Sequence, residues 1–476
     1  MTQKHPYLID RTWEHSEDTL PVTNPYTQQV FAEVCLANAA TIDRAIASAH
    51  KAFETTRKLP SYKRAQLCNE VAERIKTRRE EFAETITLES GKPLVYSRGE
   101  VARTISTFQI AAEEASRIHG EVLNLDITEA AAGKSGLVQR FPLGPISAIS
   151  PFNFPLNLVA HKVAPALAVG NPMVLKPSSF TPLTALLLGR VLCDAGIPEG
   201  MMSILPCRTD DAKALVEDDR FKMITFTGSP PVGWYIKANA GRKRVTLELG
   251  GNAGVIIEPD SDLDLAARRV CFGAFSYSGQ VCISVQRTYV HESIFDEFKD
   301  RLLKEVSSLK RGDPLDESTT IGPLIDLGNA KRIEQWVDEA VTAGAELLTG
   351  GKRNGTFVEP AVLTRVSPKV QAFCQEAFGP LLILEPYSDF EKAVEQVNNS
   401  AFGLQAGVFT NQIDKAFRAF NNLEVGGVVL NDVPTFRVDN MPYGGVKDSG
   451  FGREGVKYTI EEMTEIKLMV MDKYQD

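Results

Sequence analysis

Residues 222–237 read K-M-I-T-F-T-G-S-P-P-V-G-W-Y-I-K. The first six form a short run of apolar and β-branched side chains, which predicts a buried strand. A glycine and a serine follow, and the next residues, which begin with two prolines, have the pattern of a helix. A strand, a turn and a helix in this order are the unit from which parallel α/β sheets are built.

The same unit recurs on both sides of this stretch. Strand-like runs are P-I-S-A-I-S (145–150), P-M-V-L-K-P (172–177), M-S-I-L-P (202–206) and R-V-T-L-E-L (244–249), and helical patterns separate them. A second α/β region is predicted from about 257 to 450, and helices dominate from about 40 to 118. The sequence therefore predicts an α/β protein, in which ligands bind at the carboxyl ends of parallel strands.

Two further segments have strand patterns without intervening helices. Residues 120–142 predict two strands around a turn of small residues, and E-I-K-L-M-V-M-D (465–472) alternates like a strand. The second segment is long enough to pair with the edge of a neighbouring chain, so we expect a small β arm.

Composition and charge exclude several classes of protein. A chain of 476 residues predicts two or three domains, and its net charge of −9 argues against nucleic acid as a partner. No apolar run is long enough to cross a membrane, and M-T-Q-K-H-P-Y-L-I-D lacks the apolar core of a signal peptide. The seven cysteines and six histidines are scattered, with neither C-x-x-C nor metal-ligand spacing. We therefore expect a cytoplasmic protein without a metal.

Three side chains are candidates for catalysis. Cys282 lies in S-Y-S-G-Q-V-C-I-S-V-Q-R (276–287) and, taken alone, could equally be an inert buried cysteine. Glu248 lies in an apolar run that ends in two glycines, where burial would raise its pKa toward the range of a general base; the alternative is an exposed position on an edge strand. Asn153 of P-F-N-F-P could donate an amide N–H to an oxyanion or simply hold a turn.

Other motifs indicate an anion or nucleotide site. Gly228 permits a tight turn after the strand at 222–227, and the Ser229 hydroxyl with the free N–H groups of the next helix would bind a phosphate. A plain strand–helix turn is the alternative. Lys176 follows another strand and could bind a ribose or a phosphate, or be solvated. No G-x-G-x-x-G motif follows any of these strand-like runs, so a dinucleotide would bind here in a non-standard way.

In this order, and together with K-P-S (176–178), Q-E-A-F-G-P (375–380) and P-Y-G-G-V-K-D-S-G-F-G-R-E (442–454), these motifs resemble the NAD(P)-dependent aldehyde dehydrogenase superfamily. The 34-residue separation of Glu248 and Cys282 also fits that family. The cysteine stretch and N-D-V-P-T-F-R-V-D-N-M-P-Y-G-G (431–445) are most similar to lactaldehyde and short-chain aldehyde dehydrogenases.

The resemblance implies a mechanism. The Cys282 thiolate would attack the aldehyde, while its own N–H and the Asn153 amide stabilise the oxyanion. Hydride would pass to the nicotinamide and leave a thioester, and Glu248 would activate the water that hydrolyses it.

The resemblance also implies the residues that bind the cofactor. Lys176 and Ser229 would hold the adenosine ribose and the pyrophosphate, whereas Glu376 would hold the nicotinamide ribose and Phe378 would place the ring. The full expected set is Ile149, Ser150, Pro151, Phe152, Lys176, Ser179, Gly228, Ser229, Val232, Leu249, Gly250, Glu376 and Phe378. Many NAD-using members have a glutamate at the position of Ser179; a hydroxyl there leaves room for a 2′-phosphate, so either NAD or NADP is expected.

The implied architecture has three parts. A Rossmann-like NAD(P)-binding domain would comprise 1–119 and 141–249, an α/β catalytic domain 250–450, and an oligomerisation arm 120–140 and 460–476. The arm implies a homodimer or a homotetramer.

The expected substrate is a small aldehyde, lactaldehyde-like or a semialdehyde. Val281 and Ile283 beside the cysteine are aliphatic. The resemblance implies that Arg437 and Tyr443 line the mouth of a substrate tunnel, and Arg103 on the helical stretch V-A-R-T-I-S-T-F is expected to face it too. The two arginines could instead form ordinary salt bridges. If Arg437 faces the substrate, succinate semialdehyde or another anionic aldehyde is the alternative.

Three other functions remain as competing hypotheses. A nucleotide-independent thiol esterase would leave Lys176 and the 226–233 turn without a role. A coenzyme-A-acylating enzyme usually lacks the glutamate, and a non-enzymatic, crystallin-like protein would be expected to have lost the cysteine or the glutamate.

Overall fold

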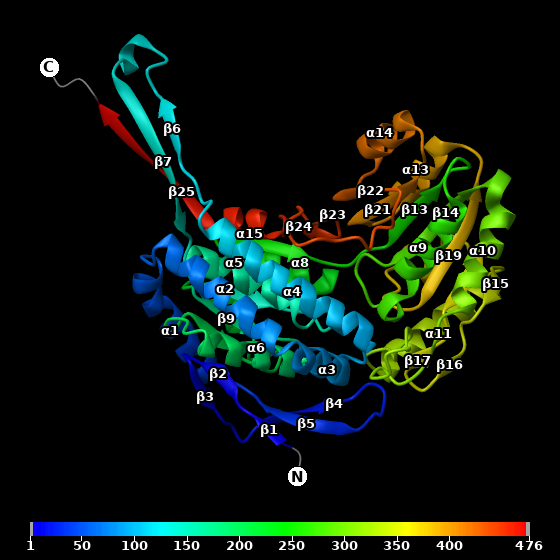
Figure 1. The fold of residues 1–476 in the computed structure, drawn as a ribbon, viewed down its shortest axis with the longest axis horizontal. Coiled ribbons are helices and arrows are strands. Elements are labelled where there is room, and N and C mark those ends of the chain that lie inside the picture. Colours follow the sequence, from blue (N-terminus) through cyan, green and yellow to red (C-terminus); the bar gives the residue numbers. More distant parts are fainter. Residues whose placement is uncertain (1–2, 473–476) are drawn as a thin grey trace.

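The computed structural model describes residues 3–472, which form two large sheets and a projecting three-stranded arm (Figure 1). The first large sheet has, in spatial order, strands β24 (Gly450–Phe451), β12 (Arg244–Glu248), β11 (Met223–Thr227), β8 (Ile146–Ile149), β9 (Met173–Lys176), β10 (Met202–Ile204), β2 (Tyr7–Ile9) and β3 (Thr12–Glu14). The five strands from β12 to β10 are parallel. They correspond to the five runs predicted between 145 and 249, so that prediction is confirmed.

The order of strands in this sheet reverses at β8. The chain continues from β8 to β9 and β10 on one side, and then places β11 and β12 on the other side. The loops that leave the carboxyl ends of β8 and β11 therefore diverge from adjacent strands, which is where open α/β sheets bind ligands.

Helices cover this sheet and separate its strands along the chain. Helix α5, which follows β8, is buried at every residue and packs with helices of the N-terminal region in one apolar core. The helices of this half are α1 (Ala39–Thr56), α2 (Ser61–Thr77), α3 (Arg79–Ser90), α4 (Leu94–Ala115), α5 (Asn157–Val169), α6 (Pro182–Asp194), α7 (Lys213–Glu217) and α8 (Pro230–Asn239). A small sheet of β1 (Gln3–His5), β5 (Val30–Cys35) and β4 (Thr19–Thr23) lies at the outer end.

The second large sheet has seven strands, of which all but β15 are parallel. Its order is β15 (Glu346–Thr349), β18 (Ala361–Thr364), β19 (Leu381–Tyr387), β14 (Val285–His291), β13 (Ala253–Ile257), β21 (Gln405–Phe409) and β22 (Gly427–Leu430). Its helices are α9 (Leu263–Phe275), α10 (Phe295–Ser307), α11 (Leu327–Thr342), α12 (Gln371–Cys374), α13 (Phe390–Asn398) and α14 (Ile413–Asn422). The pairs β16 (Arg353–Asn354) with β17 (Phe357–Val358) and β20 (Phe402–Gly403) with β23 (Val446–Lys447) complete this half.

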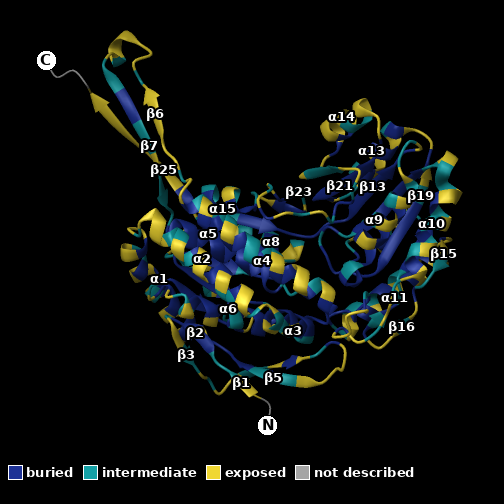
Figure 2. Ribbon diagram, in the orientation of Figure 1, coloured by how far each residue is buried: buried dark blue, intermediate teal, exposed yellow. Residues whose placement is uncertain are grey.

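The arm consists of β6 (Glu121–Asn124), β7 (Lys134–Pro142) and β25 (Thr464–Asp472). Strand β25, which follows α15 (Val456–Glu462), pairs with β7 along its whole length and is exposed from its second residue onward (Figure 2). The two strands predicted in 120–142 are confirmed, and the terminal strand pairs with its own chain. Residues 473–476 of the predicted arm lie outside the described residues, and no helix in 3–472 is long and apolar enough to span a membrane.

Candidate active site

A cavity of 980 Å³ lies between loops of the two halves. The first sheet contributes residues that follow its strands, whereas Cys282, Glu376 and Phe378 precede β14 and β19. The predicted cofactor residues that line the cavity are Ser150, Pro151, Phe152, Lys176, Ser179, Gly228, Ser229, Val232, Leu249, Gly250, Glu376 and Phe378. Of the three predicted catalytic residues, Asn153 and Cys282 line it as well.

Ile149 is the one predicted cofactor residue outside the cavity lining. It ends β8, and its half-buried side chain packs against an apolar cluster that includes Phe226 and Leu247 of the neighbouring strands. Ile149 therefore contributes to the packing between the strands and the adjoining helix. The sequence could not show this, because an aliphatic residue in a strand-like run can face either the cavity or the core.

The turn after β11 offers fewer backbone donors than the sequence suggested. Ser229 is the residue before α8, and its hydroxyl does not cap the helix. The first two helical residues are Pro230 and Pro231, which have no N–H, so Val232 is the first residue of α8 that can donate. The start of α8 therefore offers fewer free N–H groups than expected, so that expectation is wrong. A phosphate bound here would depend more on the Ser229 hydroxyl than on the helix N–H groups.

The other end of the cavity combines a carboxylate with aromatic rings. Glu376 accepts a 2.9 Å hydrogen bond at Oε1 from the N–H of Gly251, and a Cβ atom added at Gly250 would collide with the same carboxylate. Burial raises the pKa of Glu376 to about 7. The Phe152 ring lies edge-on to Phe378, with centroids 5.7 Å apart. A lysine, a serine turn, a carboxylate and aromatic walls in one cavity of this size fit the phosphates, ribose hydroxyls and flat ring of a dinucleotide.

Cys282 lies between a short 3-10 turn (Ser276–Gly279) and β14. Tyr277 and Ser278 in that turn have φ angles of 49° and 54°, a left-handed conformation that costs energy for residues other than glycine. Val281 and Ile283 are buried in a cluster with Tyr443, and Cys282 packs against this cluster. The aliphatic flanks of the cysteine therefore form an apolar wall around it, and removal from water raises the pKa of its thiol to about 11.

Asn153 is held next to the cysteine segment. Its amide nitrogen donates a 3.0 Å hydrogen bond to the carbonyl of Gln280, and the side chain is 3% exposed. An asparagine amide has two N–H groups, so one remains for another acceptor. Within residues 3–472 no hydrogen bond of the Cys282 backbone N–H is found, so two donors are free beside the sulfur, as an oxyanion site requires.

Glu248 is the last residue of β12 and is 2% exposed, so the edge-strand alternative is wrong. Within the described residues neither carboxylate oxygen has a hydrogen-bond partner. Burial and the nearby Glu454 carboxylate raise the pKa of Glu248 well above its ordinary value, although Arg437 and Lys162 oppose this. Glu248 does not line the cavity; its Oε1 lies against Gly444, where an added Cβ would come within 2.8 Å of it.

A buried ionic network lies behind the glutamate. Lys162 Nζ donates to Glu454 at 3.0 Å and to Thr227 at 2.8 Å, and Arg437 Nη2 donates to the other oxygen of Glu454 at 3.2 Å. Although burial opposes ionisation, the two cations lower the pKa of Glu454 to about 2. The guanidinium of Arg437 also lies 3.7 Å above the ring of Tyr443.

Each of the two predicted substrate arginines forms a salt bridge through one nitrogen and keeps another nitrogen without a partner in the described chain. Arg437 pairs with Glu454, and Arg103 donates from Nη2 to Asp439 at 2.8 Å. The alternative that they form salt bridges is thus confirmed for one nitrogen each. Their Nε atoms are buried and have no partner among residues 3–472, and neither arginine lines the 980 Å³ cavity.

Sequence reasoning missed several residues of the site. Lys162 and Glu454 were not singled out, although a lysine in the largely apolar stretch N-L-V-A-H-K-V-A-P-A-L-A-V (157–169) is an unusual signal. Arg332 and Trp336 of α11 also line the cavity, and no local pattern distinguishes them from a surface helix.

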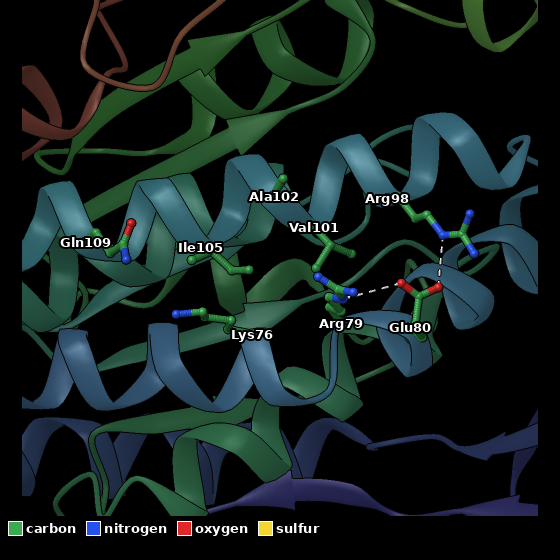
Figure 3. A pocket seen from close by; sticks show the side chains of 8 residues that line it. All are labelled: Lys76, Arg79, Glu80, Arg98, Val101, Ala102, Ile105 and Gln109. Carbon is green, nitrogen blue, oxygen red and sulfur yellow. Dashed lines mark hydrogen bonds and ion pairs between the residues drawn. The ribbon is translucent and has the colours of Figure 1, made fainter.

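A second cavity, of 640 Å³, lies far from Cys282 in sequence, among residues of α2, α3 and α4 (Figure 3). Three of its charged groups are paired, because Glu80 accepts from Arg98 at 2.9 Å and lies 3.6 Å from Arg79. Arg98 also binds Glu317 of the second half, so this surface helps to connect the two halves.

A model of the aldehyde dehydrogenase family matches residues 13–469. The chain belongs to the aldehyde dehydrogenase family. It is therefore an oxidoreductase that oxidises a small aldehyde with NAD or NADP, and the predicted aldehyde dehydrogenase fold is confirmed.

Similar proteins cover essentially the whole chain. A 3-sulfolactaldehyde dehydrogenase of Priestia megaterium is 43% identical over 99% of each chain, and a lactaldehyde dehydrogenase of Methanococcus maripaludis is 41% identical over 98% of this chain and 99% of the relative. The crystal structure of aldehyde dehydrogenase 21 from Physcomitrella patens in complex with succinate is 49% identical, covers 99% of each chain and has a TM-score of 0.98. A glyceraldehyde-3-phosphate dehydrogenase from Methanocaldococcus jannaschii in complex with NADP is 39% identical over 97% of this chain and all of that one, with a TM-score of 0.93.

Proposed function

We propose that this enzyme oxidises a small anionic aldehyde to its carboxylic acid through covalent intermediates on Cys282. The observation that carries the proposal is that Cys282 and Asn153 open into the cavity lined by nearly all the expected cofactor residues. The sulfur attacks the carbonyl carbon, and the second Asn153 N–H with the Cys282 N–H stabilises the oxygen of the thiohemiacetal.

The cofactor supplies the acceptor for the hydride that leaves this intermediate. When the cofactor is bound, Lys176, Ser179 and Ser229 would hold its adenosine and phosphate end, and Glu376 with Phe378 and Phe152 would hold its nicotinamide end. Loss of the hydride leaves a thioester on Cys282. Glu248 then takes a proton from the water that attacks the thioester, a role supported by its burial and its raised pKa. Its carboxylate must turn toward the cavity for this step, because it does not line it.

An anionic substrate is supported by two arginine side chains that each keep a buried Nε atom. Arg437 lies over Tyr443, which contacts Cys282, and Arg103 lies on α4; each has an Nε without a partner in the described chain. Two of the similar proteins are associated with an anionic compound: one is a 3-sulfolactaldehyde dehydrogenase, and the other was crystallised in complex with succinate. We therefore favour an aldehyde with a carboxylate or a sulfonate, such as succinate semialdehyde or 3-sulfolactaldehyde, over neutral lactaldehyde.

We also propose a cytoplasmic homo-oligomer with the three-part division 1–119 with 141–249, 250–450, and the arm. The support is the absence of disulfides among the seven cysteines, which suits a reducing compartment, and the exposed, largely apolar β25 at the edge of the arm.

The substrate is tested with matched pairs of aldehydes, by following the release of NADH or NADPH. Succinate semialdehyde is compared with butanal, and 3-sulfolactaldehyde with lactaldehyde. We expect kcat/KM to be at least about tenfold higher for the anionic member of each pair, because an ion pair in a buried site contributes more than about 1.4 kcal/mol. Equal values within both pairs would remove the anionic substrate and leave the lactaldehyde-like one.

A substitution at Arg437 tests whether this residue selects anionic over neutral aldehydes. In Arg437→Ala the anionic-to-neutral ratio of kcat/KM should collapse toward one, whereas Arg98→Ala, an exposed arginine on α4, should leave the ratio unchanged. A ratio that survives Arg437→Ala would exclude Arg437 as the group that selects the anion.

A further inference from the structure

Tyr443 makes a contact that its expected place at the substrate tunnel does not explain. Its phenol oxygen lies 3.1 Å from Sγ of Cys282, and the residue is 2% exposed. Among residues 3–472 the hydroxyl has no other hydrogen-bond partner. Val281, Ile283 and Leu404, which pack around it, have no hydrogen-bond acceptor in their side chains.

The chemistry of the two groups fixes the direction of this bond once the cysteine ionises. A thiolate can only accept, so the phenol must donate to it. Burial, with the neighbouring thiol and Glu248, raises the pKa of Tyr443 well above its ordinary value, so the phenol keeps its proton over the working range of an enzyme.

The charged groups around Cys282 act in opposite directions. Glu376 and Glu248 disfavour a negative sulfur, whereas Arg437, stacked 3.7 Å above the Tyr443 ring, favours it. Tyr443 is the one side chain in the described chain that makes a hydrogen-bond contact with Sγ, and Arg437 makes none.

We propose that the Tyr443 hydroxyl is a catalytic hydrogen-bond donor that stabilises the Cys282 thiolate before the aldehyde binds. The S–H bond breaks, its proton passes to water in the cavity, and the O–H···S bond strengthens because the sulfur has become negative. When the S–C bond forms, the sulfur is neutral again and the hydrogen bond weakens, so the donor does not hinder attack. This inference rests on the proposed role of Cys282 as nucleophile.

The test uses the alkylation of Cys282 by iodoacetamide, without nucleotide or aldehyde, followed by mass spectrometry of the Cys282 peptide. Wild type is compared with Tyr443→Phe, which keeps the ring under Arg437, between about pH 7 and pH 10. We expect alkylation to be about tenfold slower in the variant at each pH, because loss of one hydrogen bond to a charged group shifts the thiol pKa by about one. Equal or faster alkylation would overturn the inference.

Controls separate this effect from access and folding. The pH dependence of thiolate absorbance, taken as the difference between each protein and its Cys282→Ser counterpart, must shift to higher pH in Tyr443→Phe. If the variant only hindered access of iodoacetamide to the sulfur, the absorbance would not shift. Tyr443→His keeps an aromatic N–H donor and should recover part of the rate. Tyr7→Phe, which changes a buried tyrosine of β2, should leave the alkylation rate of Cys282 unchanged. If Cys282→Ser retained turnover, the proposed function would be wrong. If Tyr443→Phe were alkylated at the wild-type rate, this inference alone would be wrong.

Discussion

The two halves of the molecule contribute to the site from opposite ends of their strands. In the first half, Asn153 follows β8 and Ser229 follows β11, at the carboxyl ends where a parallel sheet is expected to bind ligands. In the second half, Cys282 precedes β14 and Glu376 precedes β19. Ligand binding at the carboxyl ends of parallel strands therefore explains the contribution of the first sheet. The nucleophile comes from a loop at the amino ends of the strands of the second sheet.

The two contributions also differ electrostatically. The first half provides hydroxyls, a lysine and loop backbone, which bind a ligand without needing to change charge. Around Cys282, by contrast, the thiol, Glu376 and Glu248 at the end of β12 are largely shielded from water, and each has a raised pKa. Changes at Lys176 or Ser229 should therefore alter cofactor binding, and changes at Cys282 or Glu248 should alter proton transfer and rate.

The largest effect is expected from Glu248→Gln. The amide cannot accept a proton from water, so hydrolysis of the thioester should slow by on the order of 10³-fold while its formation continues. Rapid mixing should detect a burst of about one NAD(P)H per active site followed by very slow turnover. Glu385→Gln, a half-buried glutamate of β19, serves as control. Loss of the burst itself in Glu248→Gln would contradict a role confined to deacylation.

A smaller effect is expected from Asn153→Ala, which tests the point where the halves meet. Loss of one oxyanion donor should lower kcat by about 10²-fold with little change in nucleotide affinity, because the bond from Asn153 goes to Gln280 of the cysteine segment. Stopped-flow rates and a nucleotide titration check this. An equal loss of nucleotide affinity would assign Asn153 to the cofactor side instead.

The pH dependence should separate the halves further. Cys282 must be a thiolate to react, and its pKa is raised, so kcat/KM should increase with pH by up to about tenfold per pH step between about pH 6 and pH 9. Glu248 acts after the hydride has left, so its protonation should affect kcat and not kcat/KM. Nucleotide affinity should vary less over that range, because Glu376 is the one proposed cofactor residue with a pKa raised into it, to about 7. A kcat/KM profile that is flat there would break the distinction.

The smallest effect concerns cofactor choice. In Ser179→Glu the new carboxylate would repel a 2′-phosphate, so the NADP-to-NAD ratio of kcat/KM should fall by about tenfold. Ser178→Glu, at the adjacent residue of the same cavity, is the matched control. If both variants lower the ratio equally, the effect is one of general charge and not of the Ser179 position.

Much of the fold and half of the site could be predicted from local patterns. The five parallel strands and the arm hairpin follow from alternation and turn residues, and Lys176 and Ser229 follow from positions after strands. Tyr443 and Lys162 could not be placed in the same way, because their contacts with Cys282 and Glu454 join segments 161 and 292 residues apart. Helix α8 shows a subtler limit: a helix start predicts N–H donors, but prolines at its first two positions remove them.

The most direct test of the central claim is the paired measurement of turnover and nucleotide affinity in Cys282→Ser. If the nucleophile comes from the second half and the cofactor cavity mainly from the first, aldehyde-dependent NAD(P)H release should disappear while the Kd for the nucleotide stays within about twofold of wild type. Retained turnover, or loss of nucleotide binding together with turnover in a folded variant, would contradict this assignment.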